Sequence, residues 1–390
     1  PVEDFPPSAR DYALLDARVT LAVFEYQEER CYQTSWSEEV QRWGATYRQL
    51  PSQSLQVRAA WALHHLAAWG LRSSPQRVNI WAEDLDNKRN KLKIGLMYAG
   101  LIKEKSGKRD MSAIRQSVEL AYGSKAPRTE KGQIQTSNEV LQESGDPVLL
   151  DLAEYMDLDK LKGTFEPTLQ SAAKSVLSPR WNTLVRSGRC SCTKPNLQQL
   201  PKRGGVREAF TPREGYLYVG ADYSTAELVA LAHVCEEWGI KSEMGAALRA
   251  GFDLHLALAA EMMGIDYEEA KERHSKEDKK VAEMRQLAKV PNFGLPGGLG
   301  AEGLQGFAKS SYNIELSLSE CTALRASWFK RWPEMSAYFR RIEAAEQKGY
   351  IVQSFSRRRR GGIGYTDGAN TMFQGLIADG AKIALYDVVR

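Results

Sequence analysis

The pattern of apolar and polar positions predicts three long helices and two stretches of strand. Helices are predicted over residues 148–177, 266–290 and 318–347. Strand-like runs cluster around residues 206–222 and over Tyr350–Phe355. The helix over 148–177 carries its probable core stripe on Leu149, Leu152, Met156 and Leu161.

Length and charge narrow the class of protein. A chain of 390 residues predicts two or three domains, and 43% hydrophobic with 26% charged residues is ordinary for a globular protein. Because the net charge is only +4, a nucleic-acid surface must be local. One candidate is residues 88–109, with eight Lys or Arg and one Glu; such a stretch is either a solvated face or a track for phosphates.

The same composition favours a cytoplasmic protein with no membrane partner. No apolar run reaches membrane-spanning length, and no signal peptide opens the sequence. The five cysteines lack the spacing of a zinc site, which favours reduced thiols in a cytosol.

A single aspartate follows an apolar stretch in Val219-Gly-Ala-Asp222-Tyr-Ser-Thr-Ala-Glu227. A carboxylate at the end of a buried strand is costly unless it holds a cation, which makes Asp222 a candidate metal ligand. The alternative is an aspartate that caps a helix opening at Ser224. This segment alone leaves the two interpretations equally open.

Arg285, Lys289 and Phe293 are four residues apart and would share one helix face. Two cations followed by a ring suit a nucleoside triphosphate, because cations meet phosphates and the ring stacks on the sugar or base. The alternative is a surface helix with one buried phenylalanine. Pro291 is predicted to kink this helix, and Pro296-Gly297-Gly298 to end it.

Other polar clusters are ordinary when taken singly. They are His255 in Phe252-Asp-Leu-His255, the turn Ser187-Gly188-Arg189, the run Pro195-Asn196-Leu197-Gln198, and Asn370 with Gln374. A packed histidine, turns and helix caps would explain them, although amides on one helix face can also read the minor groove. The glycines over 294–306 do not form a P-loop, because no Gly-Lys-Ser/Thr follows.

The order of these pieces resembles that of family A DNA polymerases, from about residue 10 to the end. Asp222-Tyr223-Ser224 with Glu227 is similar to motif A, and Arg285 through Gly294 is similar to motif B. The clusters at 187–189 and 195–198 resemble the primer-contacting stretch before motif A. The run Ala378–Lys382 is similar to the corresponding run in phage-borne members of the family.

The resemblance implies an α+β right-hand polymerase. Residues 1–35 would be a remnant of a 3′–5′ exonuclease domain and 36–150 the thumb with connecting helices. The palm, with an antiparallel sheet holding Asp222, would take 151–236 and 350–390, and the helical fingers 237–349.

The implied activity is template-directed DNA synthesis from deoxynucleoside triphosphates (dNTPs), by attack of a primer 3′-hydroxyl on the α-phosphorus. Two Mg²⁺ ions, for which Mn²⁺ could substitute, would be held by Asp222 and the Tyr223 carbonyl. The implied catalytic residues are Asp222 and Lys289.

The implied nucleotide site combines sugar, phosphate and base contacts. Glu227 would select deoxyribose. The other nucleotide contacts would be Tyr223, His255, Arg285, Lys289 and Phe293. The primer–template DNA would be contacted by Arg189, Asn196, Gln198, Asn370 and Gln374.

The chain departs from the family in two places. Where many members carry a tyrosine that packs on Glu227, this chain has Gly297; either another side chain substitutes or sugar selection is looser. The His-Asp-Glu motif with the second catalytic aspartate is absent, and its expected place lies beyond Arg390. Unless Asp379 or Asp387 completes the site, we expect the chain alone not to polymerise. It would be a truncated enzyme, or half of a split one whose C-terminal companion chain supplies the motif.

The sequence leaves three alternative classes of protein. Tyr12-Ala-Leu-Leu-Asp16 resembles the last motif of the proofreading nuclease, but Asp16 alone cannot support a nuclease. A single-subunit RNA polymerase shares this palm, although Glu227 and Phe293 argue against it. A non-catalytic DNA-binding fragment is the third. If the chain is phage-encoded, its expected location is the cytoplasm of a bacterial host.

Overall fold

The structure is a computed structural model that describes residues 11, 14–23, 25–26, 51–129 and 131–390. The chain divides into two units, Pro1–Leu50 and Pro51–Arg390. In the first unit, residues 14–23 are helical. Within the described residues, no helix combines the length and apolar character needed to cross a membrane.

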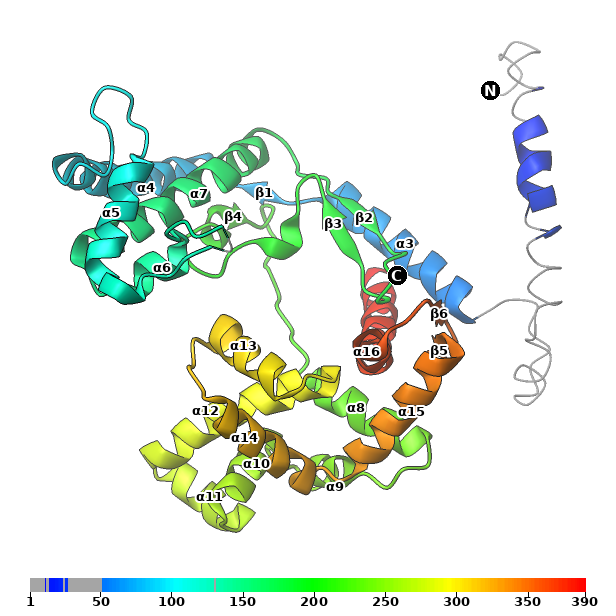
Figure 1. Cartoon of the computed structure of the whole chain (residues 1–390). Coiled ribbons are helices and arrows are strands. Elements are labelled where there is room, and N and C mark those ends of the chain that lie inside the picture. Colours follow the sequence, from blue (N-terminus) through cyan, green and yellow to red (C-terminus); the bar gives the residue numbers. More distant parts are fainter. Residues whose placement is uncertain (1–10, 12–13, 24, 27–50, 130) are drawn as a thin grey trace. The chain divides into compact units, whose positions relative to one another are not determined.

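The second unit is built mainly from α-helices (Figure 1). Their bounds are α3 Pro51–Trp69, α4 Pro75–Tyr98, α5 Met111–Tyr122, α6 Asn138–Glu143, α7 Pro147–Lys174, α8 Ala226–Glu237, α9 Glu243–Arg249, α10 Leu254–Met263, α11 Tyr267–Ser275, α12 Lys279–Gly294, α13 Ala301–Tyr312, α14 Leu318–Arg331, α15 Glu334–Lys348 and α16 Tyr365–Val389. Short 3-10 turns are η2 Gly123–Lys125, η3 Leu197–Gln199, η4 Arg207–Ala209 and η5 Leu295–Gly297.

Most helix predictions are confirmed, with breaks that have local causes. The stretch 148–177 forms α7, which begins after the capping side chain of Asp146. The stretch 266–290 is divided between α11 and α12, because Asp278 caps a new helix by accepting from the amides of Lys280 and Val281. The stretch 318–347 is divided at Pro333, which cannot continue a helix from its predecessor.

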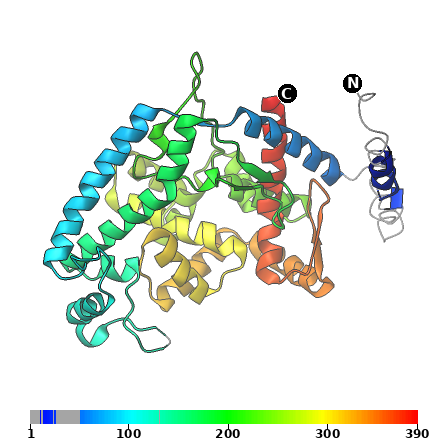
Figure 2. The same cartoon turned by 90° about the horizontal axis from the view of Figure 1, so that it is seen from above.

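Helices α4 and α7 lie along each other and carry one part of the core (Figures 1 and 2). Helices α5 and α6 cover their far end, where Leu96, Ile114, Leu141 and Leu152 are buried together. Helices α4–α7 thus share a hydrophobic core that is separate from the core of helices α8–α16.

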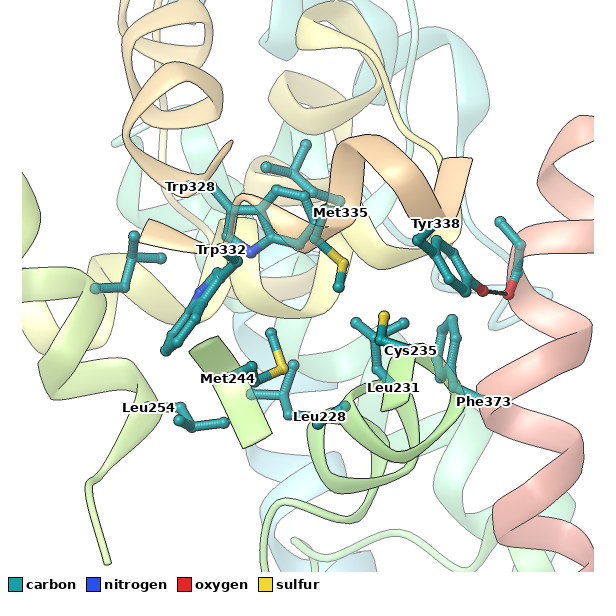
Figure 3. Packing of buried hydrophobic residues seen from close by; sticks show 14 of the residues in the cluster. Leu228, Leu231, Cys235, Met244, Leu254, Trp328, Trp332, Met335, Tyr338 and Phe373 are labelled. Carbon is teal, nitrogen blue, oxygen red and sulfur yellow. Dashed lines mark hydrogen bonds between the residues drawn. The ribbon is translucent and has the colours of Figure 1, made fainter. Parts of the chain in front are cut away.

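The largest core joins α8–α10 to α12–α16. Trp328, Trp332 and Tyr338 are fully buried in it, and Figure 3 shows them packed with Leu228, Leu231 and Met244. The hydroxyl of Tyr338 donates to the carbonyl of Ala369 at 2.6 Å, which ties α15 to α16. Helix α16 also packs on α8 and α3. Burial of these large aromatic side chains fixes the helices that carry the candidate site.

The described strands form three small antiparallel pairs. They are β1 Arg72–Ser73 with β4 Phe210–Thr211, β2 Arg180–Asn182 with β3 Ser191–Thr193, and β5 Tyr350–Val352 with β6 Arg359–Gly361. The strand predicted at Tyr350–Phe355 is therefore confirmed in its first part.

The strand prediction around 206–222 is wrong except at β4. Residues 216–223 have no regular secondary structure, and the side chains of Leu217 and Val219 are 87% and 92% exposed. An isolated strand is not stable, because neighbouring strands supply its backbone hydrogen bonds and many of its side-chain contacts. No described strand pairs with this segment, and no antiparallel palm sheet carrying Asp222 is found among the described residues.

Candidate functional site

Helix α12 presents two cations and a ring, as predicted. The guanidinium of Arg285 donates to Asp253 Oδ2 from Nε at 2.9 Å and from Nη2 at 2.5 Å, and Lys289 Nζ donates to Gln286 Oε1 at 2.9 Å. The helix runs through Pro291 and ends at Gly294, before η5, so the predicted end is confirmed.

Asp253 is a site residue that the sequence analysis missed. Its Oδ1 caps α10 by accepting from the amides of His255 and Leu256, while its Oδ2 holds Arg285. Burial opposes its charge, but the Leu256 amide and Arg285 outweigh burial and lower its pKa. One carboxylate therefore joins the start of α10 to the cationic face of α12. The capping position was readable from the sequence; the pairing with Arg285 was not.

Asn292 is a second residue that the sequence prediction missed, and its buried side chain hydrogen-bonds to residues around the site. Its Oδ1 accepts from the indole nitrogens of Trp328 and Trp332 at 3.1 and 3.2 Å. Its Nδ2 donates to the Leu254 carbonyl at 3.2 Å and lies 3.1 Å from His255 Nδ1. An indole can only donate, so the orientation of the amide is determined. Asn292 is fully buried and links α10, α12 and α14.

The hydrogen bonds of Asn292 also assign the tautomer of His255. Because the Asn292 amide donates, His255 Nδ1 must accept, and the proton lies on Nε2. Burial lowers the pKa of His255 to about 4, so the ring is neutral at pH 7. The rings of His255 and Phe293 lie 5.1 Å apart between centroids. His255 can thus give a phosphate one neutral donor, not a positive charge.

The depressed pKa of His255 predicts that stability falls as the pH drops from about 6.5 to 4. In that window the imidazole of His255 is protonated in the unfolded chain but neutral in the folded chain, so lower pH favours unfolding. A displacement from about 6.5 to about 4 corresponds to a loss of about 3 kcal/mol. Urea unfolding across this window measures it. His255→Gln, which keeps an acceptor for Asn292, should have the shallower pH dependence, whereas exposed His233→Gln should match the original chain. Equal slopes for His255→Gln and the original chain would contradict the assignment.

The structure pairs Arg189 with Glu227, two residues predicted for different tasks. Arg189 Nη2 lies 3.1 Å from Glu227 Oε1, with side chains 54% and 32% exposed. Glu227 lies in the first turn of α8, where a negative charge is favourable.

The predicted amide residues bond mainly to nearby backbone and to each other. Asn196 Oδ1 accepts from the Gln198 amide, and Gln198 Nε2 donates to the Cys190 carbonyl at 3.3 Å. Gln374 Nε2 donates to Asn370 Oδ1 at 3.2 Å, and Asn370 Nδ2 donates to the Thr366 carbonyl at 2.9 Å. These contacts fix the amides in place.

Asp222 is placed differently from the sequence prediction. It is exposed, in the irregular segment 216–223, and not at the end of a buried strand. It does not cap a helix at Ser224 either, because α8 begins at Ala226 with Thr225 in the capping position. Tyr223, beside it, is exposed as well.

The described residues do not complete a two-metal centre. Within them, no group of three or more His, Cys, Asp or Glu side chains is placed to hold a metal ion. Asp379 is fully buried in α16, Asp387 pairs with Arg390 at 3.5 Å, and among the described residues neither belongs to a group of three such side chains that could hold a metal ion. Asp222 and one carbonyl supply fewer oxygen ligands than two Mg²⁺ ions require.

Of the nuclease-like residues, Tyr12 lies outside the described residues. Asp16 is exposed on the helical stretch 14–23, where its carbonyl accepts from Thr20 Oγ1 at 2.8 Å.

Comparison with known proteins identifies the family of the chain. The family model of DNA polymerase family A matches residues 108–390. The chain belongs to DNA polymerase family A.

Curated relatives match over part of their length. The chain is 33% identical over 244 residues to the thermostable DNA polymerase I of Thermus filiformis, covering 60% of this chain and 27% of the relative. It is 30% identical over 267 residues to DNA polymerase I of Aquifex aeolicus, covering 66% and 43%. The chain thus spans less than half the length of these relatives.

A solved structure shares the fold. The POL domain of Pol1 from M. smegmatis, in complex with DNA primer-template and dNTP, matches with a TM-score of 0.65 at 24% identity. The match covers 85% of this chain and 59% of that one. At this identity the match shows the mostly helical polymerase fold.

Proposed function

We propose that this chain binds primer–template DNA and a complementary dNTP, and that it serves template-directed DNA synthesis. The observation that carries the proposal is the face of α12, with Arg285 held by Asp253, half-buried Lys289 beside it and Phe293 next to neutral His255. Cations with fixed geometry suit a triphosphate, and the ring suits the sugar or base.

Each side chain has a separate part in the proposal. Arg285 Nη1 makes no hydrogen bond with the described residues, so it and Lys289 Nζ are the donors for phosphate oxygens. Phe293 packs on the nucleotide, and Glu227 excludes the 2′-hydroxyl. The primer end is contacted by Arg189, Asn196, Gln198, Asn370 and Gln374. The assignment of 1–35 to an exonuclease remnant, 36–150 to a thumb, 151–236 and 350–390 to a palm, and 237–349 to fingers belongs to the same proposal.

We further propose that a second carboxylate comes from outside the described residues, on a strand that pairs with segment 216–223. The support is the exposed apolar face of that segment and the lone carboxylate of Asp222. An extended apolar segment without a partner is a ready site for an added strand. A companion chain is one source of such a strand. Mg²⁺, with Mn²⁺ as a substitute, is the proposed ion, since both prefer oxygen ligands.

Primer extension by this chain tests these proposals, with DNA binding measured in parallel. Binding without extension supports both the polymerase assignment and the missing carboxylate. Extension by this chain alone would show that the chain supplies this carboxylate itself and would exclude a companion chain as its source. Absence of DNA binding would reject the first. A purely DNA-binding role is the second candidate function, favoured by the incomplete metal centre, and dNTP binding that depends on the template base would exclude it.

The basic stretch 88–109 is the proposed track for duplex phosphates. Within this stretch, the Lys103 amide donates to the Lys108 carbonyl at 2.9 Å and closes a turn. Gly107, in that turn, lies close to Lys93, since a Cβ built on it would be 3.1 Å from Lys93 Nζ. Lys88, Arg89 and Lys103 pair with Asp84, Asp159 and Asp110. Among the described residues, no carboxylate pairs with Lys91, Lys93, Lys105, Lys108 or Arg109.

We expect Lys105, Lys108 and Arg109, replaced together by glutamine, to lower the salt dependence of DNA binding. Each lost phosphate contact removes about 0.9 from the slope of log K against log salt, so the triple variant should lose nearly three. Titrations at several salt concentrations measure this slope. Glutamine at Lys271 in α11, at its C-cap Lys276 and at Lys280 in α12 is the control with the same change of charge. A slope that falls equally in both variants would contradict a specific track.

A further inference from the structure

Glu227 has one cationic partner among the described residues. That partner is Arg189, whose Nη2 lies 3.1 Å from Glu227 Oε1. The pair connects α8 to the loop 183–189, which are far apart in sequence but adjacent in the fold. A carboxylate that must exclude a 2′-hydroxyl needs a fixed position, and an ion pair with a guanidinium restricts its rotamers.

Gly297, in the turn η5 after α12, has no side chain that could pack on Glu227. Gly297 stands where the family resemblance led us to expect a tyrosine, and a Cβ built there would lie 3.0 Å from Asn370 Nδ2 and 3.1 Å from Asn370 Oδ1. The amide of Asn370 therefore fills the space into which a side chain at 297 would begin. The support for Glu227 has to come from another element.

The loop 183–189 is anchored well enough to provide it. Arg358 Nη1 donates to the Arg186 carbonyl at 2.9 Å, and Lys382 Nζ donates to the Thr183 carbonyl at 3.1 Å. Gly188 has a φ of +92°, and a Cβ built on it would lie 2.5 Å from Arg358 Nη2. Since the backbone that carries Arg189 is held on two sides, less entropy is lost when its guanidinium binds.

We propose that Arg189 is the positioning residue for Glu227, in place of an aromatic residue after α12, and that it thereby sets the preference for deoxyribose. The inference rests on the proposed function and names a specificity determinant within it. Arg189 is also a proposed primer contact, and its guanidinium has donors enough for both partners. Selection of the sugar is thus linked to the engagement of the primer end.

Tyr312 is the competing partner on the neighbouring helix α13. Burial, and after it the charge of Glu227, raise the pKa of Tyr312, so the hydroxyl stays protonated near the carboxylate. Tyr312 makes an edge contact with Phe307, with ring centroids 5.8 Å apart. Tyr312→Phe separates the two explanations because it removes only the hydroxyl.

The test compares dGTP with GTP without requiring chemistry. The chain is bound to a primer–template whose primer ends in a dideoxynucleotide, with Mg²⁺ present, and nucleotide binding is read from a fluorescent base next to the templating cytosine. The variants are Arg189→Gln, Arg189→Lys, Glu227→Gln, the double variant Arg189→Gln with Glu227→Gln, and Tyr312→Phe. Thermal melting shows which variants are folded.

Arg189→Gln should reduce the preference for dGTP over GTP about five-fold, as expected for a partly exposed pair. Arg189→Lys should retain part of the preference, and Tyr312→Phe all of it. In the Glu227→Gln background, Arg189→Gln should change the preference no further, because Arg189 acts through Glu227.

Three results would overturn the inference. They are an unchanged preference in Arg189→Gln, the same fold-change in the Glu227→Gln background, or a loss in Tyr312→Phe that matches the loss in Arg189→Gln. Failure of the proposed function looks different, because the original chain would then bind neither nucleotide, or bind both equally, and the inference would fall with it.

Discussion

Replacing Asn292 with leucine is expected to lower the free energy of unfolding by about 4 kcal/mol. Leucine has a similar volume but leaves two indole N–H groups and His255 Nδ1 without partners in the core. Each buried orphan costs roughly 1–3 kcal/mol, which places the sum near this value. Urea unfolding, followed by tryptophan fluorescence, measures the loss.

Asn90→Leu is the matched control. Asn90 is exposed on α4, so the same chemical change should alter stability by less than about 0.5 kcal/mol. If Asn292→Leu were as mild as Asn90→Leu, the role of Asn292 as the link between α10, α12 and α14 would be wrong.

Lys289→Gln is expected to weaken dNTP binding about 30-fold while leaving DNA affinity nearly unchanged. A charge-assisted hydrogen bond to a phosphate contributes about 2 kcal/mol, and each 1.4 kcal/mol is a factor of ten. Lys289 Nζ is held only by Gln286 among the described residues, so it can turn to a ligand at little cost. Nucleotide titration of the DNA complex measures the change.

Lys280→Gln makes the same substitution on the opposite side of α12. We expect it to leave nucleotide affinity unchanged, since its side chain points away from the face that carries Lys289. Equal losses in the two variants would show that helix charge in general, and not the Lys289 contact, is being measured.

Features set by local rules could be predicted from the sequence. The face of α12 follows from a spacing of four residues, and its end from Pro296-Gly297-Gly298, so both are confirmed. The helix break at Asp278 could have been found from its capping chemistry. These features depend on neighbours within a few residues.

Features that depend on distant partners could not be predicted. In the sequence, Asn292 does not differ from other polar residues. Its role depends on Trp328 and Trp332, which are distant in sequence and meet it only in the fold. The pairing of Asp253 with Arg285 likewise spans two helices. An apolar run such as 216–222 specifies one half of a strand pairing, and the partner decides whether a strand forms.

Template-dependent dNTP binding tests the central claim most directly. The chain is bound to four primer–templates that differ only in the templating base, each with a dideoxy-terminated primer, and all four dNTPs are titrated into each complex. The proposed function predicts that the complementary dNTP binds at least about ten-fold more tightly than the others in every complex, a difference of 1.4 kcal/mol. Nucleotide binding that ignores the templating base, or no binding of primer–template at all, would contradict it.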